Sequence, residues 1–215
     1  MSTCRYEHET TITGLKESIL ALEFSPDGKL LASGCEDGNI RVFSTCDWKL
    51  LYTFADVSPS TSLTWHPRIE GLLFCGFKSG DVDAIQTNSP LVRRGSTAVN
   101  RSRAQVCLQA NVRLWVDDNR DPVHCLSHDP GLDVLAVGSG RGVTLASYRT
   151  QGKHVTACYN TDHLPSPPKF AQLRTAKFSE PVAQSIHFPP GEDSIIVSYL
   201  HHGVMLVFFG GLFVQ

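Results

Sequence analysis

Short apolar runs, each followed by a turn that contains glycine or proline, recur along the chain. The runs are rich in valine, isoleucine, leucine and phenylalanine, and almost no helical period is present. Such runs bounded by turn residues predict β-strands. The clearest unit is LEFSPDGKLLASGCEDGNIRVF at residues 22–43, in which Pro26-Asp27-Gly28 and Asp37-Gly38 supply tight turns between three strands. Glycine accepts the positive φ that such turns require.

Four copies of this unit can be aligned, at about residues 18–43, 61–85, 122–148 and 181–208. The interval from Gly34 to Gly76 equals that from Gly38 to Gly80, whereas the third and fourth copies follow after insertions. A repeat of this kind buries its apolar face only against its neighbours, so the pattern predicts one repeat domain over residues 1–215. Repetition also shifts the expected function from catalysis towards binding.

Further apolar runs between the copies predict an outer, fourth strand for each unit. They lie at residues 48–54, at 105–109 together with 111–115, at 153–159, and at 5–12 before the first copy. Two connecting segments lack such a pattern: a polar insertion at 88–104 and a proline-rich loop at 162–169. The expected unit is therefore a four-stranded antiparallel sheet.

The segment FSPDGKLLASG at residues 24–34 resembles the consensus of WD repeats, the units that form the blades of β-propellers. The resemblance implies an all-β, propeller-like array of about four four-stranded antiparallel blades. The Trp-Asp dipeptide of the family is absent from the end of every copy, and Gly14-Leu15 is the nearest relic of its Gly-His dipeptide. The buried polar network of the family therefore cannot form in full, and we expect apolar packing to hold the blades with modest stability.

WD-repeat propellers usually have about seven blades, so four copies are fewer than is usual in that family. Four blades still lie within the range that propellers adopt. We expect a truncated propeller, and a closed four-bladed ring is the alternative. An open arc would expose one apolar sheet face at each end, since each blade is covered only by its neighbours. Self-association through these open blade faces is therefore expected as one mode of interaction.

Composition narrows the class of partner. The 215 residues are 41% hydrophobic and carry a formal net charge of -2, which gives no reason to expect nucleic acid or a membrane as partner. The seven cysteines are odd in number and form no CxxC pair, and the N-terminus is polar. These features predict reduced thiols in an intracellular protein of the cytoplasm or nucleus.

Several residues invite a catalytic, cofactor or metal interpretation that their spacing does not support. GSGRG at residues 138–142 resembles a phosphate-binding loop, but its glycines align with Gly34 and Gly38 and no helix follows. His124 and Cys125 would point to opposite faces of a strand, and an extended chain would hold His124 and His128 too far apart to share a metal. We therefore expect no cofactor, no metal and no catalytic residues.

The alternative of an enzyme, for example a hydrolase at the central channel of a propeller-like fold, requires acids or metal ligands at aligned positions of several blades. Asp37 is the only carboxylate at its turn position among the four copies. The sequence therefore favours a non-catalytic scaffold for protein–protein interactions.

The resemblance to WD repeats also indicates where a protein partner would bind. In that family, partners often contact the turns between the second and third strands. In this chain these turns carry the charged or titratable residues Glu36, Asp37, Lys78, Arg141, His201 and His202. We expect a polar, charge-asymmetric face that suits a protein partner.

The insertion at 88–104 contains four arginines and no acid. Arg93-Arg94-Gly95-Ser96 matches the pattern read by basophilic kinases, namely two arginines, a spacer and a hydroxyl. A phosphate on Ser96 would offset the local positive charge and pair with neighbouring arginines. The chain could thus also be an adaptor that phosphorylation of this loop regulates.

Overall fold

The computed structural model describes residues 10–15, 17–87, 106–107, 111–116, 120–129, 131–140, 142–165, 181–189, 191–192, 194–200 and 202–208. The strands form four mainly antiparallel sheets, which confirms the predicted all-β, propeller-like array. We call the sheets the first to fourth blades in chain order. Within the described residues, no helix is long and apolar enough to cross a membrane.

The blades are built mainly from consecutive strands, although β8 joins the first blade and β9 the second. The first contains β1 (Ile19–Phe24), β2 (Leu30–Cys35), β3 (Asn39–Ser44), β4 (Leu50–Ala55) and, parallel to β4, β8 (Val106–Cys107). The second contains β5 (Ser60–Trp65), β6 (Leu72–Phe77), β7 (Asp81–Gln86) and β9 (Asn111–Val116). The third contains β10 (Val123–His128), β11 (Val134–Ser139), β12 (Gly142–Gln151) and β13 (His154–His163). The fourth contains β14 (Ala183–His187), β15 (Ser194–Tyr199) and β16 (Gly203–Phe208).

The outer strands follow the predicted pattern in part. Residues 48–54, 111–115 and 153–159 contribute to β4, β9 and β13, each the fourth strand of its blade. Residues 105–109 do not join β9, because β8 pairs with β4 of the first blade instead. The strand expected at 5–12 lies mostly outside the described residues, and residues 10–12 carry no strand.

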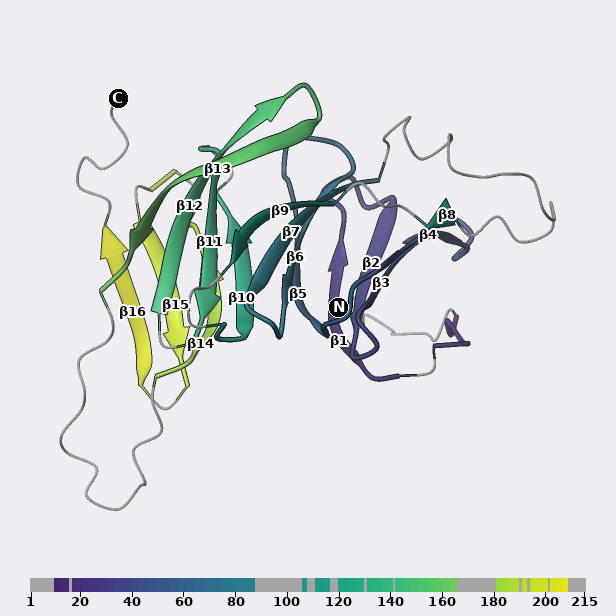
Figure 1. Cartoon of the computed structure of the whole chain (residues 1–215), viewed down its shortest axis with the longest axis horizontal. Coiled ribbons are helices and arrows are strands. Elements are labelled where there is room, and N and C mark those ends of the chain that lie inside the picture. The colour runs from purple at the N-terminus through teal and green to yellow at the C-terminus, as the bar shows by residue number, and fades with distance from the viewer. Residues whose placement is uncertain are drawn as a thin grey trace, which may run out of the picture.

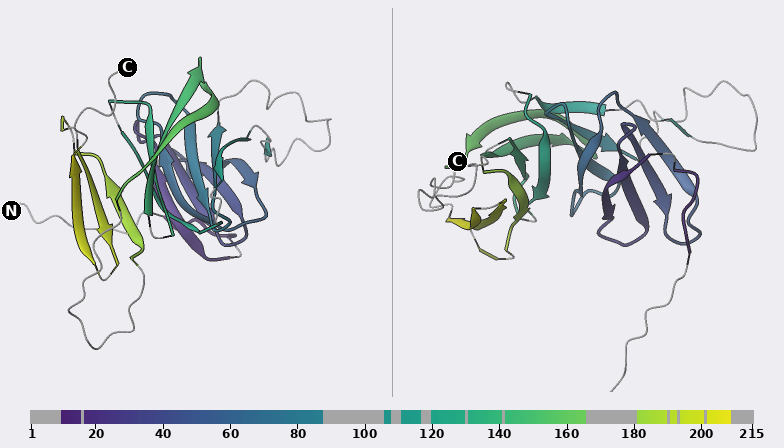
Figure 2. Two further views of the ribbon diagram at one scale, coloured as in Figure 1. Left: turned by 60° about the vertical axis from the view of Figure 1, so that its left-hand side comes forward. Right: turned by 90° about the horizontal axis from the view of Figure 1, so that it is seen from below.

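The four blades stand in a curved row, with β1 to β4 at one end and β14 to β16 at the other (Figure 1). The view from below shows the same row as an arc (Figure 2). The first strands of the blades lie nearest one another, since β1 contacts β5, β5 contacts β10 and β10 contacts β14. Within the described strands, each blade thus packs against the blade before it and the blade after it, as expected for a repeat array.

An apolar cluster fills each of the three spaces between neighbouring blades. Val42 and Trp65 belong to the cluster between the first and second blades, and Phe74 and Val137 to the next. The cluster between the third and fourth blades includes Leu145. All of these side chains are buried. Apolar burial between blades is thus the main stabilising contribution, at about 25 cal/mol for each Å² removed from water.

Glycines in the second strands allow neighbouring blades to approach closely. A Cβ on Gly34 would lie 2.7 Å from Ser60 Oγ of the second blade, and one on Gly76 would collide with Val123 of the third. A Cβ on Gly138 would lie 3.1 Å from Ala183 of the fourth blade. Gly138 is therefore a strand residue at a contact between blades, not the hairpin glycine expected from its alignment.

Candidate protein-interaction surface

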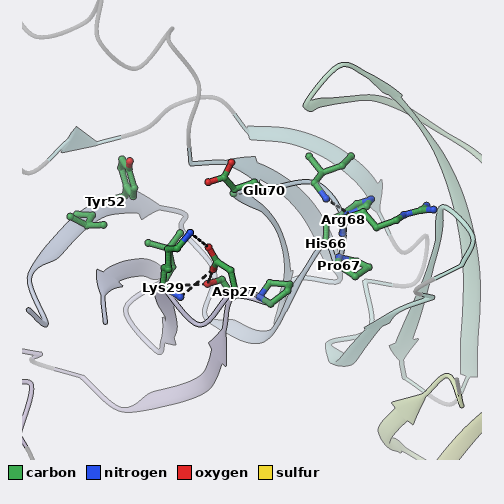
Figure 3. A pocket seen from close by; sticks show the side chains of 13 residues that line it. Asp27, Lys29, Tyr52, His66, Pro67, Arg68 and Glu70 are labelled. Atoms are coloured by element: carbon green, nitrogen blue, oxygen red, sulfur yellow. Dashed lines mark hydrogen bonds and ion pairs between the residues drawn. The ribbon is translucent and has the colours of Figure 1, made fainter. Parts of the chain in front are cut away.

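A groove of about 320 Å³ opens between the first two blades, where the β1–β2 turn faces the β5–β6 turn (Figure 3). Leu30, Leu51 and Tyr52 supply apolar or aromatic surface from the first blade, and Ile69 supplies it from the second. Charged residues flank this surface on both sides, namely Asp27, Lys29, Arg68 and Glu70. A concave apolar surface with a few polar groups at its margin is typical of a binding site.

Hydrogen bonds within the β1–β2 turn hold the first wall of the groove in place. Ser25 Oγ donates to Asp27 Oδ1 at 2.6 Å and accepts from the backbone N–H of Leu30 at 2.9 Å. Lys29 Nζ lies 3.0 Å from Asp27 Oδ2. The hydrogen bonds from Ser25 and Lys29 lower the pKa of Asp27 to about 2, so this carboxylate is ionised at neutral pH.

The second wall is formed by the turn after β5, which folds around the imidazole of His66. His66 Nδ1 accepts the backbone N–H groups of Arg68 at 3.0 Å and Ile69 at 2.9 Å. The buried His66 ring thus acts as a cap for this turn, in the way that Ser25 does in the first blade. This places the side chains of Arg68 and Glu70 at the margin of the groove.

Ion pairs connect this second wall to the third blade. Arg68 Nη2 lies 2.7 Å from Asp133 Oδ1, and Lys153 Nζ lies 3.3 Å from Glu70 Oε2. All four side chains are substantially exposed. Exposed pairs of this kind contribute about 0–1 kcal/mol, so a binding partner could exchange them for its own charges at little cost.

His66, His128 and Asp133 place possible metal-ligand atoms within 4.8 Å of one another. The hydrogen bonds at His66 disfavour its use as a ligand. Because Nδ1 accepts two backbone N–H groups, the neutral ring carries its proton on Nε2, and this is the atom that points to Asp133 Oδ1 at 3.7 Å. A metal-bound histidine instead donates through its other nitrogen.

The same histidines belong to a buried aromatic group between the second and third blades. His128 Nε2 shares a hydrogen bond with the hydroxyl of Tyr148, and Phe74 stacks on the His128 ring at 5.8 Å between centroids. Burial lowers the pKa of His128 to about 3. These rings thus fix the position of the groove's second wall relative to the third blade.

Those predicted turn residues that the structure describes lie at the opposite end of the blades from this groove. Glu36 and Lys78 are exposed at equivalent turns of the first two blades, and Asp37 is half-buried. Asp37 Oδ2 pairs with Arg41 Nη2 at 2.7 Å, and Asp37 Oδ1 accepts the backbone N–H of Asn39 at 2.9 Å. Asp37 therefore stabilises its own hairpin.

The other predicted residues can be located only in part. His202 is half-buried, and its Nδ1 lies 2.8 Å from the carbonyl oxygen of Leu200. Arg141 and His201 lie outside the described residues, as do Ser96, Arg93 and Arg94 of the suggested phosphorylation site. The groove itself was not predicted, although Pro26 and Pro67 mark the aligned turns that form it.

Comparisons with known proteins agree with the repeats and the propeller-like fold of the chain. A family model described as "WD domain, G-beta repeat" matches residues 6–44. The "Periodic tryptophan protein 2 homolog" of Dictyostelium discoideum is 27% identical over 118 residues, which cover 54% of this chain and 11% of that protein. Residues 6–44 thus carry a WD repeat, and the chain as a whole resembles WD-repeat proteins. It spans only a small part of the length of this curated relative.

Two solved structures share the propeller-like fold of this chain. The computationally designed Ika4 protein matches with a TM-score of 0.57 and 15% identity, over 93% of this chain and 96% of that one. A chain of the Mitotic Checkpoint Complex matches with a TM-score of 0.62 and 13% identity, over 91% of this chain and 51% of that one. WD repeats support a role as a protein-interaction scaffold in general.

Proposed function

We propose that this WD-repeat chain is a non-catalytic scaffold that binds an extended segment of a protein partner in the groove between its first two blades. The observation that carries this proposal is the groove itself, in which an apolar floor lies between two turns that carry charges of both signs. A suitable segment would insert an apolar side chain beside Tyr52 and place charged side chains next to Lys29 and Glu70. A partner with this pattern is a protein rather than a nucleic acid, because the groove presents no excess of positive charge.

The turn face at the other end of the blades is a second docking surface in this proposal. It consists of Glu36, Asp37, Lys78, Arg141, His201 and His202. Glu36 and Lys78 occupy the same turn position in successive blades and are both exposed, so the charge reverses from one blade to the next. Such a pattern would favour one orientation of a charged partner.

Selection from a library of displayed peptides tests the groove and needs no purified partner. Peptides selected on the wild-type chain should lose binding to the double variant Lys29→Glu, Glu70→Lys, which reverses two exposed charges at the groove. The double variant Glu36→Lys, Lys78→Glu reverses two exposed charges at the other end and is the matched control. Loss of binding only in this control would assign the peptides to the turn face, and retention in both variants would contradict the proposal.

The proposal also places the chain inside the cell. The free cysteines among the described residues include buried Cys35, Cys75 and Cys125 and exposed Cys46. Burial raises the pKa of Cys75, and raises that of Cys125 to about 12, so these two thiols stay protonated and serve as small packing residues. Regulation through a phosphate on Ser96 of the 88–104 insertion belongs to the same proposal.

A further inference from the structure

The apolar residues exposed on the first blade occupy positions that are covered in the second. Leu22 of β1 and Leu63 of β5 hold equivalent positions, because they pair with equivalent residues in the second strands of their blades. Phe24 and Trp65 are equivalent for the same reason. Leu63 is 7% exposed and Trp65 is 4% exposed, because both pack against the preceding blade. Leu22 and Phe24 are 57% and 56% exposed. The first blade therefore presents a face that is built to follow another blade.

The fourth blade also exposes apolar residues at positions that are covered in other blades, but on the face that points away from the third blade. Val204 of β16 holds the same position in its blade as Val82 of β7 and Val143 of β12. Each of the three pairs with the equivalent residue of the second strand of its blade. Val82 and Val143 are no more than 1% exposed, whereas Val204 is 71% exposed. Leu206 is likewise 48% exposed, although its counterpart Leu145 is 2% exposed. The fourth blade therefore presents a face that is built to precede another blade.

These two faces are the two halves of one contact, which the arc already makes three times between its own blades. We propose that a second copy of this chain covers them, with the fourth blade of each copy packed against the first blade of the other. A contact between two different faces closes into a ring when its rotation permits. Two arcs of four blades would give eight blades, which is within the range of known propellers.

One residue distinguishes the proposed contact from the three internal ones. Ser198 of β15 occupies the position that Gly34, Gly76 and Gly138 hold in the second strands of the other blades. Each of these residues pairs with the equivalent residue of the third strand of its blade, which for Ser198 is Val204. Where glycine permits close approach, Ser198 adds a side chain whose Oγ lies 2.7 Å from Ser185 Oγ. The contact between copies is therefore looser than the contacts within the arc.

Sedimentation velocity across a range of concentrations tests the pairing. The wild-type chain should shift reversibly from one copy to two. Leu22→Glu and Leu206→Glu should each weaken the pairing at least about tenfold, because each places a charge in an apolar contact. Val57→Glu is the control, since Val57 is exposed on a loop away from both faces and should leave pairing unchanged. A wild-type chain that stays single at every concentration, or that grows without limit, would overturn the proposal.

A mixing experiment identifies which faces meet. Leu22→Glu keeps the face of the fourth blade intact, and Leu206→Glu keeps that of the first. The two variants mixed together should therefore associate more strongly than either alone, through one intact contact. If the first blades instead met each other, Leu206→Glu alone would pair as the wild type does, and the proposal would be wrong. Ser198→Gly should lower the dissociation constant of the wild-type chain, and an unchanged or higher value would contradict the assigned contact.

Discussion

The indole nitrogen of Trp65 in the second blade donates a hydrogen bond of 3.1 Å to the backbone carbonyl oxygen of Glu23 in the first. The bond crosses between blades at a place where the aligned residue of the first blade is the exposed Phe24. It lies inside an otherwise apolar cluster and thus helps to fix the position of the two sheets relative to each other. The groove lies between the same two blades, so this bond also contributes to its geometry.

Trp65→Phe should remove this hydrogen bond while keeping an aromatic ring in the cluster. We expect the free energy of unfolding to fall by about 1–2 kcal/mol, because the carbonyl loses its partner and some apolar surface is lost. Denaturant titration followed by circular dichroism would measure the change. Trp48→Phe is a suitable control, since Trp48 lies in a partly exposed turn and should give a much smaller loss.

Gly76→Ala should destabilise the contact between the second and third blades. The added methyl group would collide with Val123 and lie 2.6 Å from Ser62 Oγ. Overpacking of this kind costs about 1–3 kcal/mol. Gly142→Ala is a matched control, because a Cβ at Gly142 meets nothing within 4 Å. Equal melting temperatures for the two variants would show that the blades are not closely packed at Gly76.

Arg113 neutralises a group of three carboxylates on the second blade and its preceding loop. Its guanidinium nitrogens lie 3.1 Å from Asp83, 3.2 Å from Asp81 and 3.4 Å from Asp56. Arg113→Met should cost about 2 kcal/mol at pH 8, because it leaves the buried Asp83 without its counter-charge.

The cost of Arg113→Met should shrink towards pH 5. Burial already raises the pKa of Asp83 in the wild type, and loss of Arg113 would raise this pKa further, so the carboxyl takes up a proton more readily in the folded variant. Urea titrations at both pH values would measure the difference. Adding Asp83→Asn should recover most of the loss, and no recovery would show that Arg113 acts through packing.

The sequence was sufficient to predict the sheets but not the contacts between them. Most strands of a blade follow one another closely, so turns such as Asp37-Gly38 and runs such as residues 30–35 carry the information locally. The parallel pairing of β8 with β4 joins residues from different units, and no local pattern indicates it.

The groove was missed for the same reason. Tyr52, Lys29 and Arg68 belong to separate turns or strands that stacking brings together, and none stands out within its own repeat. Glu36, Asp37 and Lys78 lie in turns, as their alignment predicts. Asp37 is nevertheless engaged with Arg41, which only the folded hairpin reveals. An open arc, in contrast, was expected from the number of repeats, with a closed four-bladed ring as the alternative.

The buried pair of His128 and Tyr148 should make the fold sensitive to acid. Burial lowers the pKa of His128 from 6.5 to about 3, so the folded state holds this ring neutral while the unfolded chain binds a proton below about pH 6.5. The stability that depends on the neutral ring is therefore present above pH 6.5 and is lost as the pH falls towards 3. At pH 5 the loss should be about 2 kcal/mol relative to pH 7.5.

Urea titrations of the wild type and of His128→Gln at these two pH values would measure this contribution. The variant should be less stable at pH 7.5, since it disturbs the hydrogen bond to Tyr148, but it should lose less on acidification. His66, whose pKa burial also lowers, should retain a smaller sensitivity in the same direction. Val57→Gln, on an exposed loop and without a titratable group, should behave as the wild type does. An unchanged acid response in His128→Gln would mean that the titrating group lies elsewhere in the fold.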